Sequence, residues 1–465
     1  MNFRIYLLVL PLILAPFELT LAGLTPEAKI IVDRAHRSET NGWIYLHVEG
    51  PASERGFQHG YLLAREIGEE IRVRRVLWKH ESSMEWPWLL EKASAMFERK
   101  IDHENLEELD GIVAGMRAAS VETTRAELIA YNGFFELNWY WWPKELKKIK
   151  GQTAAPPKQA CSSFIATGSM TADGGIVLGH DTFFDYPEAS ANVVIDIHPR
   201  QGHRIVMQTY PGWIHSGTDF FLTDAGLVGS ETTIGGLSGF DENGVPEFAR
   251  FRRATQDAPS IDEWCAIMRQ GNNGGYANAW LLGDIRSGEI ARLELAQQNV
   301  AFEKKKDGYF TGSNVAEDLR ILRLETDDND MDVRSSSVAR RERWKKLMRD
   351  NKGRIDLARA REMLADHYDV YLEKNRPGGR SLCGHSELDS AQFGHVTPYS
   401  PGGCFDGKVV DTAMAREMSF VARWGAACGT PFSAKTFLAK HPQFDWMEGI
   451  LKDRPRQPWT EFKAQ

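Results

Sequence analysis

The feature that most constrains this chain of 465 residues is the change at Cys161 from a linker-like sequence to strand-forming runs. Residues 151–160 are small and polar and contain two prolines, which is typical of a linker. Cys161 comes next and opens a short apolar run, and a turn at residues 173–175 leads into a second run that ends in His180 and Asp181. Two apolar runs around a glycine-containing turn predict a β-hairpin. A cysteine therefore stands at the start of the first strand, and a histidine and a carboxylate stand at the end of the second.

The residues before the linker favour helices, and the residues after it favour strands. From about residue 25 to 150, after a short extended start, apolar residues recur at the three-to-four spacing of a helix face. After the linker, short strand-forming runs alternate with turn residues, and helices return near 246–255 and 260–270. A basic helix is predicted near 338–352, and its charge run is interpreted as a solvated face. Sheets in the middle with helices before and between them predict a layered sandwich of the α+β class.

Composition argues against nucleic acid as a partner. The net charge is −8, and 26% charged with 42% hydrophobic residues is ordinary for a globular protein. The chain has 14 tryptophans, and a Trp-Tyr-Trp-Trp cluster occupies residues 139–142. We interpret the cluster as core packing, because aromatic rings carry much of the buried area of a protein. The alternative is that it forms the wall of an apolar acyl pocket.

The first 22 residues resemble a secretory signal peptide. Arg4 supplies the positive charge, residues 5–15 form the apolar segment, and residues 20–22 form a small-residue cleavage site. An uncleaved membrane anchor is the alternative, although the apolar segment is short and interrupted by proline. The expected location is therefore outside the cytoplasm: secreted, periplasmic or in a lysosome-like compartment.

The chain has five cysteines, and export permits disulfides. If Cys161 is a free nucleophile, three pairings remain for Cys265, Cys383, Cys404 and Cys428. The last three lie in one glycine-rich region, where a bridge between two of them is expected, whereas Cys265 fits a buried helix position. No Cys-x-x-Cys pair or histidine-rich spacing suggests zinc, and we expect no metal or organic cofactor.

Cleavage between Ala160 and Cys161 would leave a thiol and a free α-amine on one residue. An α-amine has a pKa of about 8, so it can act as the built-in base for the thiol. This is the logic of an N-terminal nucleophile (Ntn) hydrolase. The alternative is a cysteine that acts only as a small buried apolar side chain.

Three further residues are candidates for the same chemistry. The hairpin brings His180 toward Cys161, where an imidazole can orient the thiol or assist proton transfer, unless it only bonds a backbone carbonyl. Asp181 can orient His180 or bind the free α-amine, or it can simply form a turn. Asn278 opens an apolar strand, where its amide can donate to a developing oxyanion, although turn chemistry explains an asparagine there equally well.

In combination these residues resemble the phospholipase B-like proteins and the wider peptidase family C45, which includes the acyl-CoA:6-aminopenicillanic acid (isopenicillin-N) acyltransferases. The similar stretches follow the family's order along most of residues 40–445. They are Cys161-Ser162-Ser163-Phe164, Val177-Leu178-Gly179-His180-Asp181-Thr182-Phe183, Thr209-Tyr210-Pro211-Gly212, Glu231-Thr232-Thr233-Ile234 and Gly275-Tyr276-Ala277-Asn278-Ala279-Trp280.

The chain also departs from the family's pattern. Asp181 stands where these relatives commonly have threonine, and Ala277 and Ala279 flank Asn278. His180 stands where the related bile salt hydrolases have arginine, so their substrates are not carried over.

The resemblance implies a four-layer αββα Ntn-hydrolase sandwich made as a precursor. Residues 1–22 would be the signal peptide, 23–150 a mainly helical region, 151–160 a processing linker, and 161–465 the catalytic region. The chain would be cut between Ala160 and Cys161, and the two pieces would stay associated. Cys161 would be the nucleophile, with His180 and Asn278 in supporting roles.

The sequence therefore predicts a secreted, self-processing cysteine hydrolase that cleaves amide or ester bonds of acylated small molecules or lipids. A peripheral membrane lipid is one candidate substrate. An acyltransferase of the same fold, with an amine acceptor in place of water, is the first alternative. A non-catalytic secreted binding protein is the second.

Overall fold

The computed structural model describes residues 23–152, 161–188, 190–217, 219–237, 239–390 and 397–465. The predicted signal peptide, Ala160 and all but the first two residues of the predicted processing linker lie outside these residues. Within the described ranges, no helix is both long enough and apolar enough to cross a membrane.

The first of two large sheets draws strands from both sides of the predicted linker. In spatial order its strands are β1 (His36–Thr40), β2 (Trp43–Gly50), β6 (Val193–Pro199), β7 (Ile205–Thr209), β8 (Phe220–Thr223), β9 (Leu227–Thr233), β10 (Asn278–Asp284), β11 (Glu289–Leu295) and β12 (Val300–Lys305). β2 pairs with β6 in parallel, whereas the other neighbours pair antiparallel. Residues 23–150 thus complete this sheet, and their separation as a region of their own stays a prediction.

The second sheet carries the predicted hairpin at its centre. In spatial order its strands are β13 (Gly308–Gly312), β3 (Ser162–Thr167), β4 (Val177–Asp181), β17 (Asp406–Asp411), β18 (Ser419–Trp424) and β19 (Thr460–Lys463). The hairpin is confirmed, because β3 and β4 pair antiparallel with Ser162 opposite Asp181. Two short ribbons lie outside the large sheets: β5 (Phe183–Asp185) with β16 (Gly402–Cys404), and β14 (Tyr368–Asp369) with β15 (Lys374–Asn375).

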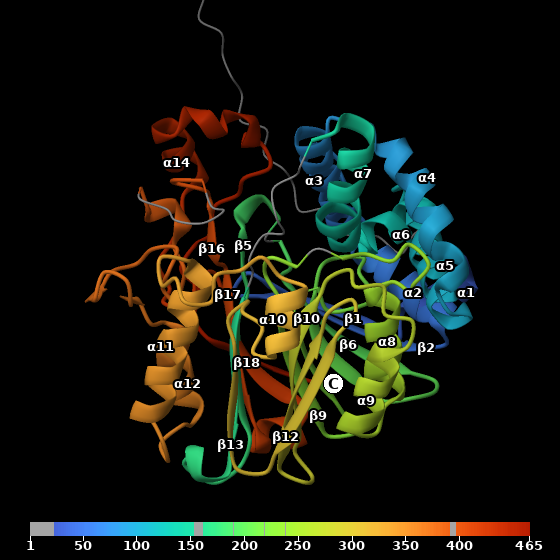
Figure 1. The fold of residues 1–465 in the computed structure, drawn as a ribbon. Coiled ribbons are helices and arrows are strands. Elements are labelled where there is room, and N and C mark those ends of the chain that lie inside the picture. Colours follow the sequence, from blue (N-terminus) through green and yellow to red (C-terminus); the bar gives the residue numbers. More distant parts are fainter. Residues whose placement is uncertain (1–22, 153–160, 189, 218, 238, 391–396) are drawn as a thin grey trace, which may run out of the picture.

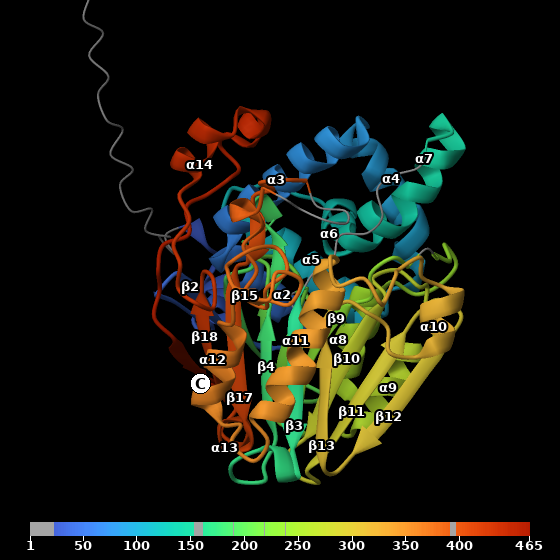
Figure 2. The ribbon, with the colours of Figure 1, turned by 60° about the vertical axis from the view of Figure 1, so that its left-hand side comes forward.

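The two sheets pack face to face with helices on both outer faces (Figure 1). β3 and β4 contact β9, and Ser163 Oγ lies 2.6 Å from Ser230 Oγ across the interface. α11 (Ser336–Asp350) and α12 (Leu357–Leu364) cover the second sheet, as Figure 2 also shows. α8 (Glu247–Asp257) and α9 (Ile261–Arg269) cover the first, where the Trp264 ring of α9 lies 5.0 Å from the Trp280 ring of β10. The predicted four-layer αββα sandwich is confirmed.

The N-terminal region is mainly helical, as predicted. Its helices are α1 (Pro26–Val32), α2 (Ala52–Leu62), α3 (Ala64–Ser82), α4 (Trp86–Phe97), α5 (His103–Ala118), α6 (Arg125–Asn132) and α7 (Trp142–Lys150). The later helices not yet named are α10 (Leu319–Leu324), α13 (Thr412–Arg416) and α14 (Ala434–Lys440).

α2 and α5 approach each other backbone to backbone. A Cβ atom on Gly56 of α2 would lie 2.0 Å from the Glu108 carbonyl oxygen, and one on Gly115 of α5 would lie 2.2 Å from the Phe57 carbonyl oxygen. Only glycine therefore permits this crossing. The pair places the helical region firmly beside the first sheet, because α2 also contacts β2.

The aromatic cluster at residues 139–142 is buried and packs into the core. The Trp139 ring stacks on Phe135 at 4.5 Å between ring centres, and the Trp142 ring meets Trp78 edge-on at 5.2 Å. The interpretation of this cluster as core packing is confirmed.

Candidate active site

Cys161 immediately precedes β3 and is almost completely buried, with 1% of its surface exposed. Its φ angle is +83°, in the left-handed region that residues other than glycine rarely adopt. Strained backbone of this kind clusters at functional sites. The fold therefore holds the candidate nucleophile in a constrained and enclosed position.

Arg340 on α11 holds the backbone of Cys161 in place. Its Nη1 donates to the Cys161 carbonyl oxygen at 2.5 Å and to Ser162 Oγ at 3.0 Å. Its Nη2 donates to Asn314 Oδ1 at 2.7 Å. Burial lowers the pKa of Arg340 to about 10, so the guanidinium remains charged at neutral pH.

The interpretation of the α11 charge run as a solvated face is wrong at Arg340, which is fully buried. It holds at Lys346, which pairs with Asp350 in the solvent. The missed signal is the spacing of Arg340 with the buried residues Trp344 and Leu347, which share its side of the helix. Because Arg340 is charged, the sequence analysis assigned it to the solvent and missed its place in the site.

A buried acidic pair lies near Cys161. Tyr276 Oη donates to Asp219 Oδ2 at 2.7 Å, and the carboxyl groups of Asp219 and Glu231 are hydrogen-bonded to each other. Burial raises the pKa of both carboxyl groups. Burial, followed by the charges of Glu231 and Asp219, also raises the pKa of the Cys161 thiol well above its usual value, although Lys408 opposes this shift. In this structure the sulfur is therefore a neutral thiol.

His180 lies on β4 opposite Ser163, two positions along β3 from Cys161. Its Nε2 lies 2.9 Å from the carbonyl oxygen of Glu231. Burial and the nearby charge of Lys408 lower the pKa of His180 well below its usual value, so the ring is neutral. Because a carbonyl can only accept, Nε2 carries the proton and Nδ1 keeps a lone pair. Among the described residues that Nδ1 has no hydrogen-bond partner.

Asp181 lies on the opposite face of β4 from His180, because side chains alternate along a strand. The structure therefore does not bring these two side chains together. Burial, together with the nearby Cys404 thiol and Asp406 charge, raises the pKa of Asp181 well above its usual value. This shift favours the neutral acid, which does not suit a role as counter-ion to an amine.

The sequence also missed a buried ion pair behind the hairpin. Lys408 Nζ lies 2.8 Å from Asp406 Oδ1 and donates to Thr182 Oγ1 at 2.7 Å. The Asp406 carboxylate also accepts from Thr182 N at 3.0 Å and from Gln208 Nε2 at 2.7 Å. Both residues of the pair sit on β17, beside β4, so only sheet pairing brings them to the site.

Asn278 begins β10, two residues after Tyr276, and is 1% exposed. Neither atom of its side-chain amide has a hydrogen-bond partner among the described residues. A buried amide without partners costs free energy unless it serves a ligand or a transient charge. Asn278 is therefore available as a donor.

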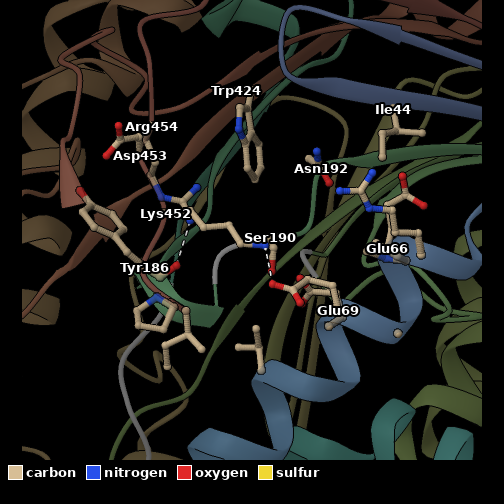
Figure 3. A pocket seen from close by; sticks show the side chains of 17 residues that line it. Ile44, Glu66, Glu69, Tyr186, Ser190, Asn192, Trp424, Lys452, Asp453 and Arg454 are labelled. Carbon is tan, nitrogen blue, oxygen red and sulfur yellow. Dashed lines mark hydrogen bonds and ion pairs between the residues drawn. The ribbon is translucent and has the colours of Figure 1, made fainter. Parts of the chain in front are cut away.

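A cavity of about 640 Å³ opens elsewhere, between α3 and the segment after α14 (Figure 3). Tyr186, Ser190 and Trp424 line it, and Glu69 of α3 pairs with Lys452 at 3.1 Å. Cys161 does not line this cavity. Its lining therefore does not connect this cavity with the thiol, which is almost completely buried.

Among the residues that the structure describes, one group of side chains could hold a metal ion, and it lies outside this site. It comprises His367, Cys383, His385 and Cys428. All five cysteines are free thiols, so the bridge expected among Cys383, Cys404 and Cys428 does not form.

The fold and the site define an αββα sandwich with a cysteine at the start of an inner strand. Within that class, residues 89–320 match the family model described as phospholipase B. Phospholipase B-like 1 from Homo sapiens is 25% identical over 273 residues, which cover 52% of this chain and 45% of that protein. Phospholipase B from Crotalus adamanteus is 26% identical over 297 residues, or 56% of this chain and 51% of that protein. The predicted resemblance to the phospholipase B-like proteins is confirmed.

The matches are partial in length. An uncharacterized protein from Archaeoglobus fulgidus is 27% identical over 203 residues, which cover 40% of this chain and 32% of that protein. The matched stretches thus span about half or less of these relatives. Among solved structures, a mutant of the conjugated bile acid hydrolase from Clostridium perfringens aligns with 57% of this chain and 89% of its own. Its TM-score is 0.30 at 8% identity, and a similarity this low carries no argument.

Proposed function

We propose that this chain is an acyl hydrolase whose nucleophile is Cys161, freed by cleavage of the peptide bond between Ala160 and Cys161. The observation that carries the proposal is the position of Cys161 at the start of an inner strand. The residue is buried, its backbone is in the left-handed region, and its carbonyl oxygen accepts a hydrogen bond from Arg340. The phospholipase B match supports the acyl substrate class. Residues 151–160 then act as a processing linker, and the two pieces stay associated because strands from both form one sheet.

In the proposed reaction the new α-amine of Cys161 takes the thiol proton. The thiolate attacks the acyl carbonyl carbon, a carbon–sulfur bond forms, and the carbonyl oxygen becomes an oxyanion. The leaving amine or alcohol departs with the proton held by the α-ammonium group. Water then attacks the thioester, and the free acid leaves as the thiol is restored.

The neighbouring residues take supporting roles in this scheme. The Asn278 amide donates to the oxyanion, which is the role for which its unpartnered state suits it. His180 presents a neutral Nδ1 lone pair on the same face as Cys161, so it orients the thiol or the attacking water. Arg340 is a positioning residue, because it acts through the backbone of Cys161.

Processing doubles as activation. Burial and two nearby carboxyl groups keep the Cys161 sulfur protonated in the uncut chain. Cleavage adds an α-amine next to the sulfur, and the ammonium charge that forms when this amine takes the thiol proton stabilises the thiolate. The precursor would therefore be inert until it is cut.

The substrate would be an acylated small molecule or a lipid, with either an amide or an ester bond. Export follows from the signal-like residues 1–22 and would place the enzyme in an extracytoplasmic or lysosome-like compartment. The mechanism needs no metal at Cys161, because the α-amine serves as the base.

The test is intact mass and N-terminal sequencing of the exported full-length protein, with Cys161→Ala and the matched control Cys265→Ala. We expect wild type and Cys265→Ala to give two chains, the larger beginning Cys-Ser-Ser-Phe, and Cys161→Ala to stay uncut. Cleaved protein would then release free acid from acyl amides or esters. Maturation of Cys161→Ala, or a mature larger chain that starts elsewhere, would overturn the proposal. Transfer of the acyl group to an added amine in place of water would identify an acyltransferase.

A further inference from the structure

Four side chains from three separate segments converge beside the second sheet. His367 precedes β14, Cys383 and His385 precede the short helix at Ser386–Leu388, and Cys428 follows β18. Their ligand atoms, one nitrogen or sulfur from each, all lie within 4.8 Å of one another. Cys383 and His385 are fully buried, with exposures of 0% and 1%. The convergence is independent of the catalytic proposal, because it involves neither Cys161 nor the linker.

The two distances from His385 to the cysteine sulfurs match those of a tetrahedral metal site. Bonds of about 2.3 Å from sulfur and about 2.05 Å from nitrogen, at tetrahedral angles, separate the two donor atoms by about 3.6 Å. His385 Nε2 lies 3.4 Å from Cys428 Sγ and 3.7 Å from Cys383 Sγ. These two distances fit a single tetrahedral ion, and all four ligand atoms lie close enough together to share one.

The surroundings orient the donor atoms as a metal site does. Glu387 Oε1 lies 3.0 Å from His385 Nδ1, so the carboxylate accepts the Nδ1 proton and turns the Nε2 lone pair toward the two sulfurs. Thr430 N donates to Cys428 Sγ at 3.3 Å, which stabilises negative charge on that sulfur. The His367 side chain is hydrogen-bonded to Cys428, and its ring lies 5.2 Å from the His385 ring.

We propose that His367, Cys383, His385 and Cys428 bind one zinc ion in a closed structural site. Two thiolates and two imidazoles in a tetrahedron are the set that zinc prefers. Because four protein atoms fill the coordination sphere, no position remains for water, and the ion is structural. A Cys383–Cys428 disulfide would use only the sulfurs and would leave both imidazoles facing them without a purpose.

Cys404 stands next to the group but outside it. Its Sγ donates to the Asp406 carbonyl oxygen at 3.2 Å and accepts from Ala427 N at 3.3 Å. The same sulfur is also hydrogen-bonded to the Cys383 side chain, yet Cys404 is not one of the four converging residues. Cys404 is therefore a neighbouring cysteine that serves as a stringent control.

The zinc ion would brace the segment that packs on the neighbours of Cys161. A Cβ atom on Gly384, between two ligands, would lie 1.6 Å from the Phe183 ring, so the segment rests directly on that ring. The Arg340 guanidinium lies over the same ring, 5.2 Å from its centre. Loss of the ion would therefore loosen the packing around Arg340.

The test is the metal content of full-length protein purified without chelators, measured by plasma mass spectrometry together with a count of free thiols. We expect about one zinc per chain. After exchange with cobalt(II) alone, the protein should show a thiolate-to-cobalt charge-transfer band and tetrahedral visible bands. Zinc-free protein whose intact mass reveals a disulfide at Cys383 or Cys428 would overturn the proposal, as would free thiols that give no cobalt spectrum.

Variants make the test specific to these residues. Glu387→Gln keeps all four ligands and should weaken zinc binding by roughly 10- to 100-fold. The matched control Glu373→Gln, on an exposed residue nearby, should leave affinity unchanged. Cys428→Ser should lose the ion and the cobalt band, whereas Cys404→Ala and Cys265→Ala should retain both. Zinc that persists at full stoichiometry in Cys428→Ser would contradict the assignment.

Discussion

The guanidinium of Arg340 and the carbonyl oxygen of Cys161 form a buried hydrogen bond that ties the outer helix α11 to the proposed nucleophile. The same side chain also bonds Ser162 and Asn314, so one residue joins three segments at the start of β3. The left-handed backbone of Cys161 is held by this contact, among others.

Arg340→Lys should lower kcat about 100-fold with little change in KM, because an ammonium group cannot reach all three acceptors and the nucleophile shifts. Steady-state kinetics of the cleaved protein checks this, with Lys346→Ala on the exposed side of α11 as control. An unchanged kcat in Arg340→Lys would show that the contact is only structural.

Asn278→Leu should slow acyl hydrolysis by roughly 10²- to 10³-fold, because the oxyanion loses a donor. Stability should not fall, since no described group loses a hydrogen bond when this amide is removed. Thermal unfolding and kcat measured together separate the two effects. Asn273→Leu is the contrasting variant. Asn273 donates a hydrogen bond to Glu136, so its loss should cost about 1–3 kcal/mol of stability.

Asp181→Asn should be nearly silent in both stability and activity, because burial favours the neutral acid at Asp181 and the side chain faces away from His180. Asp406→Asn should cost about 3–5 kcal/mol, since it removes the carboxylate charge that neutralises the buried Lys408 ammonium group. Chemical unfolding of the two variants gives the comparison. A large loss of activity in Asp181→Asn would restore a direct role for that residue.

Glu136 makes a pH-dependent contribution to stability. Burial raises its pKa from 4.5 to about 7, while hydrogen bonds from Asn273 and Glu247 oppose the shift. Between pH 4.5 and about pH 7, Glu136 is therefore protonated in the folded state but ionised in the unfolded state. The resulting stabilisation is fully present below pH 4.5 and is lost as the pH rises through about 7.

The unfolding free energy of the wild type should therefore rise when the pH is lowered from 8 to 4.5. In Glu136→Gln this rise should be smaller by about 3 kcal/mol, because glutamine does not titrate. Urea unfolding at a series of pH values measures this difference. Glu91→Gln, on a side chain that is 73% exposed, is the control and should follow wild type. Parallel curves for Glu136→Gln and wild type would show that the carboxyl titrates normally.

Much of the fold could be predicted from the sequence because its signals are local. The turn at residues 173–175 and the two apolar runs fixed the β3–β4 hairpin, and helical spacing marked α8, α9 and α11. The same local patterns drew attention to Cys161 and His180, which both lie at the inner face of that hairpin. Sequence analysis did not show that β1 and β2 would join a sheet made mostly of residues after the linker, since that pairing spans more than a hundred residues.

The sequence by itself determined the secondary structure, the resemblance to the phospholipase B-like proteins, and Cys161 as the candidate nucleophile. Only the tertiary structure decided that Arg340 is buried against that residue, that Asp181 faces away from His180, and that His367, Cys383, His385 and Cys428 meet. Spacing along the chain encodes which side chains share a helix or strand, because that depends on local backbone geometry. Which segments then face each other depends on how whole sheets and helices pack, and no short stretch of sequence carries that information.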